Sequence, residues 1–236
     1  MPLQALTLDL DDTLWPVWPT IRRAEAAQQA WLRDRAPATL QMHDAAALRD
    51  LREAVLRERP DWAHDLGKLR RKTLRRALLA AGDDPALAQP AFEVFFAERQ
   101  KVDLYEDVLP ALARLAARWP VVALSNGNAD VHRVPGLGRH FHAALSAADL
   151  GVGKPSPLAF AEACRRAGAE PAHTLHIGDD AALDVDGALD AGLQAAWVRR
   201  ITLPGSGPPR GRPQHVVATL QELADRLLGY GPAAAR

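Results

Sequence analysis

The stretch that decides the fold is Leu6-Thr7-Leu8-Asp9-Leu10-Asp11-Asp12-Thr13-Leu14-Trp15, an apolar run that leads into three carboxylates. Residues 3–10 have the alternation and the leucine content of a buried central β-strand. Carboxylates this close together repel one another, and burial increases the cost. A cation at the carboxyl end of a parallel strand, where ligands lie in open α/β sheets, would remove the conflict. The stretch predicts a strand that ends in an anionic ligand site; the alternative is a strand that runs into a polar turn.

The composition limits the possible classes of protein. The chain has 236 residues, 48% of them hydrophobic, which fits one α/β domain with an insertion or two small domains. Basic and acidic residues number 29 each, and this balance argues against nucleic acid or a membrane as a partner. The chain opens without a signal-peptide pattern and contains no apolar run of membrane-spanning length. We expect a cytoplasmic protein that is a monomer or a homodimer.

Residues 16–104 have helical spacing and contain no convincing strand. Predicted helices there cover 20–35, which Pro37 ends, then 43–59 and 66–81, and a fourth follows Pro85 and runs to about Lys101. Further strands are expected at 121–124, 143–146, 174–177, 194–198 and 215–217, with helices at 108–118, 157–168 and 183–192 and a loop at 204–213. Such alternation predicts βαβ units and a mainly parallel sheet. The expected fold is α/β, with a Rossmann-like parallel sheet core from residues 1–15 and 105–236 and an inserted helical domain at 16–104.

Polar side chains follow three of the predicted strands. In chain order they are Asp9, Asp11 and Asp12, then Ser125 and Asn126, then Asp179 and Asp180, with Lys154 in a Gly/Pro loop between the last two sets. Parallel strands bring all of these groups to one edge of the sheet. Few carboxylates together with water and phosphate oxygens suit Mg²⁺, and a lysine with a hydroxyl suits the other oxygens of a phosphoryl group.

The order of these groups resembles the haloacid dehalogenase-like hydrolase superfamily. Its four motifs match Asp9-Leu10-Asp11-Asp12-Thr13, Leu124-Ser125-Asn126, Lys154-Pro155, and Gly178-Asp179-Asp180 with Asp184. One such motif is a weak signal, whereas four in the order of the family are a strong one. The helical block at 16–104 lies where the family carries its helical cap domain.

The resemblance implies the chemistry of the carboxylates. Asp9 would be the nucleophile that forms an aspartyl-phosphate, and Asp11 would protonate the leaving oxygen and later activate water. Mg²⁺ would be held by the Asp9 carboxylate, the Asp11 backbone carbonyl and Asp179. The family's dehalogenases lack the second carboxylate of the first motif, so the presence of Asp11 favours phosphate over halide. Asp12 is expected to be a turn residue.

The remaining motif residues would hold the phosphoryl group. Ser125 and Lys154 would bind its oxygens, with Asn126 as a further substrate contact, and Lys154 would offset charge in the transition state. Asp180 or Asp184 would orient Lys154 or a metal-bound water, and the sequence does not rank the two.

The substrate is expected to be a small-molecule phosphate ester. Trp15 and Trp18 follow the first motif and either stack on a substrate ring or pack between the domains. The segments 125–129, 136–138 and 176–180 are similar to a bacterial branch that acts on FMN and on 5-amino-6-(5-phosphoribitylamino)uracil. Alternatives are a phosphomutase or a 2-haloacid dehalogenase on the same fold, a receiver-like signalling protein, and a non-catalytic phosphate- or Mg²⁺-binding protein.

Overall fold

The computed structural model describes residues 2–200 and 207–229. By their contacts the residues divide into two compact units, one made of Met1–Pro16 with Asp103–Arg236 and the other of Val17–Val102. Of the loop predicted at 204–213, residues 207–213 contain no helix or strand, and 204–206 lie outside the described residues. No helix in the described ranges is long and apolar enough to cross a membrane.

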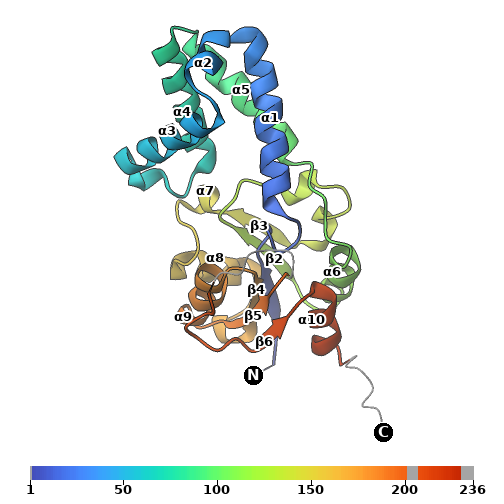
Figure 1. Ribbon diagram of the computed structural model, residues 1–236. Helices are drawn as coiled ribbons and strands as arrows, with labels where there is room; N and C mark the ends of the chain where they lie inside the picture. Colours follow the sequence, from blue (N-terminus) through green and yellow to red (C-terminus); the bar gives the residue numbers. More distant parts are fainter. Residues whose placement is uncertain (1, 201–206, 230–236) are drawn as a thin grey trace. The chain divides into compact units, whose positions relative to one another are not determined.

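The first unit is built on a six-stranded sheet in the order β3-β2-β1-β4-β5-β6, with every neighbouring pair parallel (Figure 1). The strands are β1 (Ala5–Leu8), β2 (Val121–Ser125), β3 (Ala143–Ser146), β4 (Thr174–Gly178), β5 (Gln194–Val198) and β6 (His215–Val217). The strands β1, β2 and β4 are buried along their whole length, as parallel strands covered on both faces must be. The chain order reverses at β1, between β2 and β4, which is the switch point where α/β sheets bind ligands. The predicted parallel α/β fold is confirmed.

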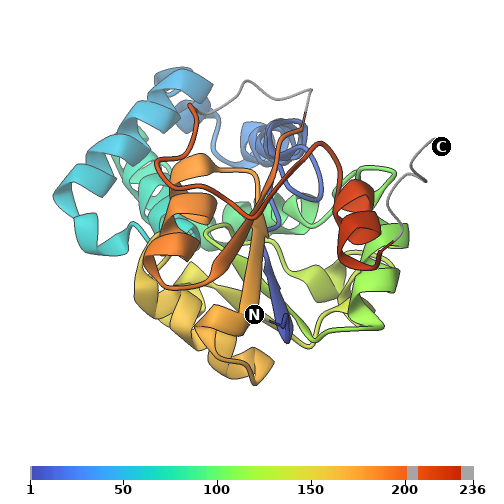
Figure 2. The same cartoon turned by 90° about the horizontal axis from the view of Figure 1, so that it is seen from below.

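Helices cover both faces of this sheet, with α8 and α9 on one side and α6 and α10 on the other (Figure 2). The helical segments of this unit are α6 (Val108–Ala116), η3 (Val131–Arg133), η4 (Gly138–His140), α7 (Ala147–Leu150), α8 (Pro157–Ala167), η5 (Pro171–His173), η6 (Ala181–Asp186), α9 (Gly187–Asp190) and α10 (Leu220–Leu227). Phe160 of α8, Val185 of η6 and Leu124 of β2 belong to one apolar core. Leu112 of α6 and Leu223 of α10 are fully buried on the helices of the other face.

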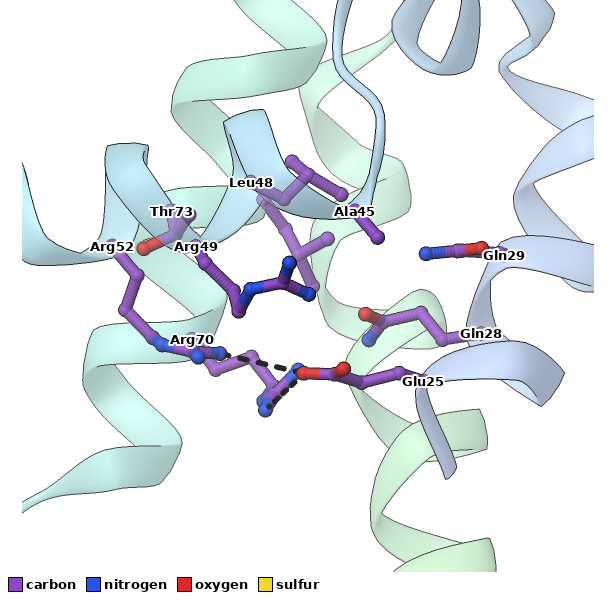
Figure 3. Close-up of a pocket in the computed structure, with 10 residues that line it drawn as sticks. Glu25, Gln28, Gln29, Ala45, Leu48, Arg49, Arg52, Arg70 and Thr73 are labelled. Atoms are coloured by element: carbon purple, nitrogen blue, oxygen red, sulfur yellow. Dashed lines mark hydrogen bonds and ion pairs between the residues drawn. The ribbon is translucent and has the colours of Figure 1, made fainter. Parts of the chain in front are cut away.

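The second unit is entirely helical within its described residues. It consists of α1 (Val17–Arg35), α2 (Pro37–Met42), α3 (Ala45–Glu58), η1 (Pro60–Trp62), α4 (Leu66–Ala81), η2 (Pro85–Leu87) and α5 (Ala88–Arg99). Leu32 of α1, Leu78 of α4 and Phe95 of α5 belong to its apolar core. A polar pocket lies among α1, α3 and α4 (Figure 3).

Two sequence predictions about helices need correction. Pro37 does not merely end a helix: it begins α2, because a proline at the first helical position lacks only an N–H that would have no partner there. The predicted helix at 183–192 begins earlier and is divided into the π-helical segment η6 and α9. The Asp180 carboxylate starts this segment by accepting hydrogen bonds from the N–H groups of Ala182 and Leu183.

Candidate active site

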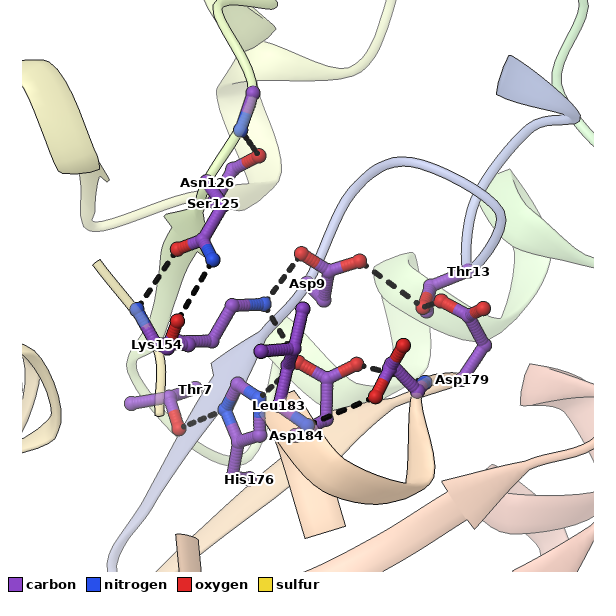
Figure 4. A network of polar contacts seen from close by, with 12 residues as sticks. Thr7, Asp9, Thr13, Ser125, Asn126, Lys154, His176, Asp179, Leu183 and Asp184 are labelled. Atoms are coloured by element: carbon purple, nitrogen blue, oxygen red, sulfur yellow. Dashed lines mark hydrogen bonds and ion pairs between the residues drawn. The ribbon is translucent and has the colours of Figure 1, made fainter. Parts of the chain in front are cut away.

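Residues from three neighbouring strands and one loop meet in a pocket at the carboxyl edge of the sheet (Figure 4). Asp9 follows β1, Ser125 is the last residue of β2, and Asp179 directly follows β4. Because β1 pairs in parallel with both β2 and β4, these three positions lie side by side. The pocket is lined by Asp9, Asp11, Asp12, Ser125, Asn126, Gly127, Lys154, Asp179, Asp180, Leu183 and Asp184.

Lys154 is the cationic centre of the pocket. Its buried Nζ donates to Asp9 Oδ1 at 2.5 Å and to Asp184 Oδ1 at 2.6 Å. Burial alone would lower the pKa of the Lys154 ammonium, but the negative charges of Asp184 and Asp9 raise it above its ordinary value. Lys154 is therefore charged at neutral pH and holds the two carboxylates close together.

The negative charge of the carboxylates in the pocket exceeds the positive charge of Lys154. Oxygen atoms of Asp9, Asp179 and Asp184 all lie within 4.8 Å of one another. Burial raises the pKa of Asp9 to about 7, although the charge of Lys154 acts in the opposite direction. Burial and the charge of Asp9 raise the pKa of Asp179 to about 8. A divalent cation would stabilise the ionised forms, and the oxygen-rich donor set fits Mg²⁺.

Asp184 has both of its oxygens occupied by protein groups. Oδ1 accepts from Lys154 and lies 3.1 Å from His176 Nε2, and Oδ2 accepts the Asp180 N–H at 2.9 Å. Burial alone would raise the pKa of Asp184, but the charge of Lys154 and the hydrogen bond with His176 hold it below its usual range. Asp184, which the sequence did not rank against Asp180, is thus the one that contacts Lys154.

Asn126 fixes the backbone that carries Lys154. Its amide nitrogen donates to the Lys154 carbonyl and its Oδ1 accepts the Lys154 N–H, both at 2.8 Å. Gly153 allows this approach, since a Cβ there would lie 2.6 Å from Asn126 Oδ1. Both ends of the amide thus position the Lys154 backbone, and the predicted contact of Asn126 with substrate stays a prediction. Ser125 Oγ accepts the Gly127 N–H at 3.0 Å, so its own proton remains available to an acceptor in the pocket.

Trp15 has a different place from the predicted stacking surface. Its side chain has no exposed area, so it cannot stack on a substrate ring in this conformation. Its indole N–H instead donates to Asp11 Oδ1 at 2.8 Å. The turn between them places Asp12 in the left-handed region, with φ 58° and its N–H bonded to the Trp15 carbonyl, which fits the expected turn residue. Trp18 belongs to the helical unit, and 60% of its surface is exposed.

A profile of the haloacid dehalogenase-like hydrolase family matches residues 3–192, which include all four motifs. The chain belongs to this family. It is 34% identical to the 5-amino-6-(5-phospho-D-ribitylamino)uracil phosphatase YigB of Escherichia coli K12, over 84% of each chain. Phosphoserine phosphatase of Thermus thermophilus is 31% identical over 94% of this chain and 98% of that protein. The crystal structure of a 2-haloacid dehalogenase from Pseudomonas syringae pv. tomato DC3000 superposes with a TM-score of 0.88, at 37% identity, over 97% of this chain and 100% of that one.

Three residues of this haloacid dehalogenase-like hydrolase support the site without having been predicted to do so. Thr13 Oγ1 donates to Asp179 Oδ1 at 2.9 Å and lies 3.4 Å from Asp9 Oδ2. The Arg200 guanidinium holds the Thr13 carbonyl at 2.7 Å. His176, interpreted from sequence as structural, is bonded through Nδ1 to Thr7 at 2.9 Å and through Nε2 to Asp184.

The sequence held a signal for only two of these residues. Thr13 lies inside the first motif, and His176 occupies an inward-facing position in the alternating pattern of a buried strand. The contact of Arg200 spans 187 residues and has no local pattern.

Proposed function

We propose that this haloacid dehalogenase-like hydrolase is a Mg²⁺-dependent phosphate monoesterase that acts on a small molecule through an aspartyl-phosphate on Asp9. The observation that carries the proposal is the pair of first-motif carboxylates in one pocket. Asp9 lies against Lys154, whereas Asp11 is held by a neutral indole N–H. Two acids in different surroundings can perform two different tasks.

Asp9 is the nucleophile. Its Oδ1 is occupied by Lys154, while Oδ2 lies 3.4 Å from Thr13 Oγ1, which leaves Oδ2 the less engaged oxygen for attack on phosphorus. Attack forms the bond from Asp9 to phosphorus and breaks the bond from phosphorus to the ester oxygen. The Lys154 ammonium and the Ser125 hydroxyl stabilise the charge on the phosphoryl oxygens.

Asp11 is the general acid and base. It donates a proton to the departing alcohol and then takes a proton from the water that hydrolyses the aspartyl-phosphate. The Trp15 N–H donates to Oδ1 of Asp11 at 2.8 Å and so orients the carboxyl group that transfers the proton. A halide leaves without protonation, so this residue is a reason to prefer phosphate esters over haloacids.

Mg²⁺ fits beside Asp9 and Asp179, with the Asp11 backbone carbonyl as a further ligand. Burial, together with the charges of neighbouring carboxylates, raises the pKa values of Asp9 and Asp179, and a divalent cation would favour their ionised forms. When bound, the cation neutralises charge on the phosphate and aligns it with Asp9. The Thr13 hydroxyl keeps Asp179 oriented toward the same pocket.

The proposed substrates are FMN, 5-amino-6-(5-phosphoribitylamino)uracil or a related small phosphate ester. Support comes from the relative in Escherichia coli that is named for the second of these compounds. The proposed cap is the helical unit Val17–Val102. A panel of phosphate esters ranked by kcat/KM tests the assignment, and a serine phosphate belongs in the panel because another relative is named for it.

The test of the reaction uses an aryl phosphate. The wild-type protein should release phosphate with Mg²⁺ and stop when the metal is chelated. Asp9→Asn should lower the rate at least 1,000-fold, on the order expected for loss of a nucleophile, while the circular dichroism spectrum stays unchanged. A folded Asp9→Asn variant that keeps a near-normal rate would exclude the nucleophilic role of Asp9.

A 2-haloacid dehalogenase is the second candidate. The structural similarity to the Pseudomonas syringae protein favours it. Halide release from 2-chloropropionate, measured beside phosphate release under the same conditions, decides between the two activities. A higher kcat/KM for the haloacid would reverse the order of the two proposals.

A further inference from the structure

The helical unit contains a cationic pocket that the catalytic site does not use. It lies among α1, α3 and α4, and every residue that lines it belongs to Val17–Val102. Its charged members are Arg49, Arg52 and Arg70, with Glu25 as the single acid (Figure 3). Gln28, Gln29 and Thr73 add polar groups to the wall. Three guanidinium groups and one carboxylate leave an excess of two positive charges.

Two of the arginines converge on one oxygen of the acid. Arg70 reaches Glu25 Oε1 with Nη1 at 3.3 Å and Nη2 at 3.2 Å, and Arg52 Nη1 lies 3.7 Å from the same oxygen. The Arg70 guanidinium also lies 3.6 Å from the centre of the Phe95 ring, which fixes its plane. Burial and the nearby charge of Arg52 lower the pKa of Arg70 to about 10. The single negative charge of Glu25 therefore does not balance the two positive charges of Arg52 and Arg70.

Arg49 supplies the third positive charge. Within residues 2–200 and 207–229 it forms no hydrogen bond or ion pair, and its guanidinium points into the space bounded by Glu25 and Gln28 (Figure 3). Gln28 is held across the pocket because its amide donates to the Ala91 carbonyl at 3.0 Å. Arg49 is exposed and lines the pocket, so its guanidinium can present its donors to an anion that enters from solvent.

We propose that this pocket binds a phosphate group, with Arg49 and Arg52 as its main ligands and Arg70 as the less exposed cation behind them. A phosphate carries a charge between about −1.5 and −2 at pH 7, which matches the excess of the pocket. Its oxygens fit the forked donors of arginine, whereas a metal cation would be repelled. The phosphate comes either from the free ion or from a phosphate monoester. This inference does not depend on the catalytic activity proposed above.

The test observes the arginine side chains directly. The full-length protein, with metal chelated, is titrated with inorganic phosphate, and the Nε–Hε NMR signals of arginine are followed. Sodium chloride at equal ionic strength is the reference. Saturable shifts are expected for Arg49, Arg52 and Arg70. No saturable shift, or an equal shift with chloride, would overturn the proposal.

Two variants and one matched control assign the site. Arg49→Gln and Arg52→Gln should each weaken phosphate binding at least ten-fold. Arg57→Gln removes the same charge from the same helix, but Arg57 is exposed and pairs with Glu53 outside the pocket, so it should change the affinity less than two-fold. If all three variants weaken phosphate binding equally, the binding is general electrostatic attraction to the helix, and the proposed site is wrong.

Glycerol phosphate in place of inorganic phosphate identifies the source of the ligand. Tighter binding of glycerol phosphate assigns the pocket to a monoester, and tighter binding of phosphate assigns it to the free ion. If neither binds, the site does not exist. Thermal unfolding of each variant verifies that the helical unit remains folded.

Discussion

At the scale of single residues, the site depends on short polar contacts that hold each acid in its own surroundings. Lys154 forms ion pairs with both Asp9 and Asp184, while Trp15 holds Asp11 without adding charge. The sequence predicted that these acids meet, because each follows a buried parallel strand. It could not predict the Trp15 contact, since that contact requires a turn in which Asp12 takes a left-handed conformation.

Replacing Trp15 by phenylalanine removes the N–H and retains most of the ring. We expect kcat to fall roughly ten-fold for alkyl phosphates, in line with the loss of one hydrogen bond to a charged group, because the acid is less well placed. Aryl phosphates with acidic leaving groups should be affected less. The measurement is kcat against leaving-group pKa. Trp18→Phe is the control, and a uniform loss for all esters would contradict the positioning of Asp11 by Trp15.

Replacing Lys154 by methionine leaves two buried carboxylates without their cation. The free energy of unfolding should fall by roughly 3 kcal/mol, as for other broken buried ion pairs, and activity should be lost. Urea unfolding measures the first effect. The double variant Lys154→Met with Asp184→Asn should recover part of the stability, and strictly additive losses would show that the two residues are not coupled.

At the scale of secondary-structure elements, several helices and strands have the bounds that the sequence pattern predicted. Residues 143–146 and 194–198 form strands with the predicted bounds, and Leu66–Ala81 is a helix that begins after an aspartate cap and ends at Gly82 with φ 78°. Segment η6 departed from its pattern because Asp180 and Asp184 turn their side chains onto backbone N–H groups. Side-chain bonds of this kind override hydrophobic periodicity over a single turn.

Gly178, the last residue of β4, has no room for a side chain. A Cβ there would lie 2.3 Å from the Asp184 carboxyl carbon, so Gly178→Ala should displace Asp184 from Lys154. We expect a loss of roughly 2 kcal/mol in unfolding free energy, typical of overpacking, together with lower activity. Gly207→Ala, which meets nothing within 4 Å, is the matched control for chemical unfolding. Unchanged stability of Gly178→Ala would mean that Asp184 moves aside freely.

At the scale of the whole molecule, protonation of the site is expected to oppose the proposed binding of Mg²⁺. With pKa values of about 7 for Asp9 and about 8 for Asp179, both carboxylates hold more protons in the folded state than in the unfolded chain between pH 4 and pH 7. Without metal, their contribution to stability therefore falls as pH rises through that range. The pKa of buried His176 is lowered, so its contribution has the opposite sign.

The rise in Tm caused by Mg²⁺ should therefore increase from pH 6 to pH 8.5, because fewer protons must leave the site at higher pH. Differences taken with and without Mg²⁺ at each pH remove the contribution of His176. Thermal unfolding across this range is the measurement. Asp179→Asn should lose most of the effect, and a Mg²⁺ stabilisation that is constant with pH would exclude these carboxylates as its source.

The chain leaves the sheet unit after Pro16 and returns at Asp103, and the Tyr105 N–H bonds to the Leu14 carbonyl at 3.0 Å where the two connections pass. The two connections to the 86-residue helical unit Val17–Val102 are thus held together by a hydrogen bond within the sheet unit. An inserted unit whose two ends leave the host close together can change in length or be replaced during evolution without disrupting the unit that contains the sheet. The same hydrolytic machinery can in this way be inherited intact while the choice of substrate diverges.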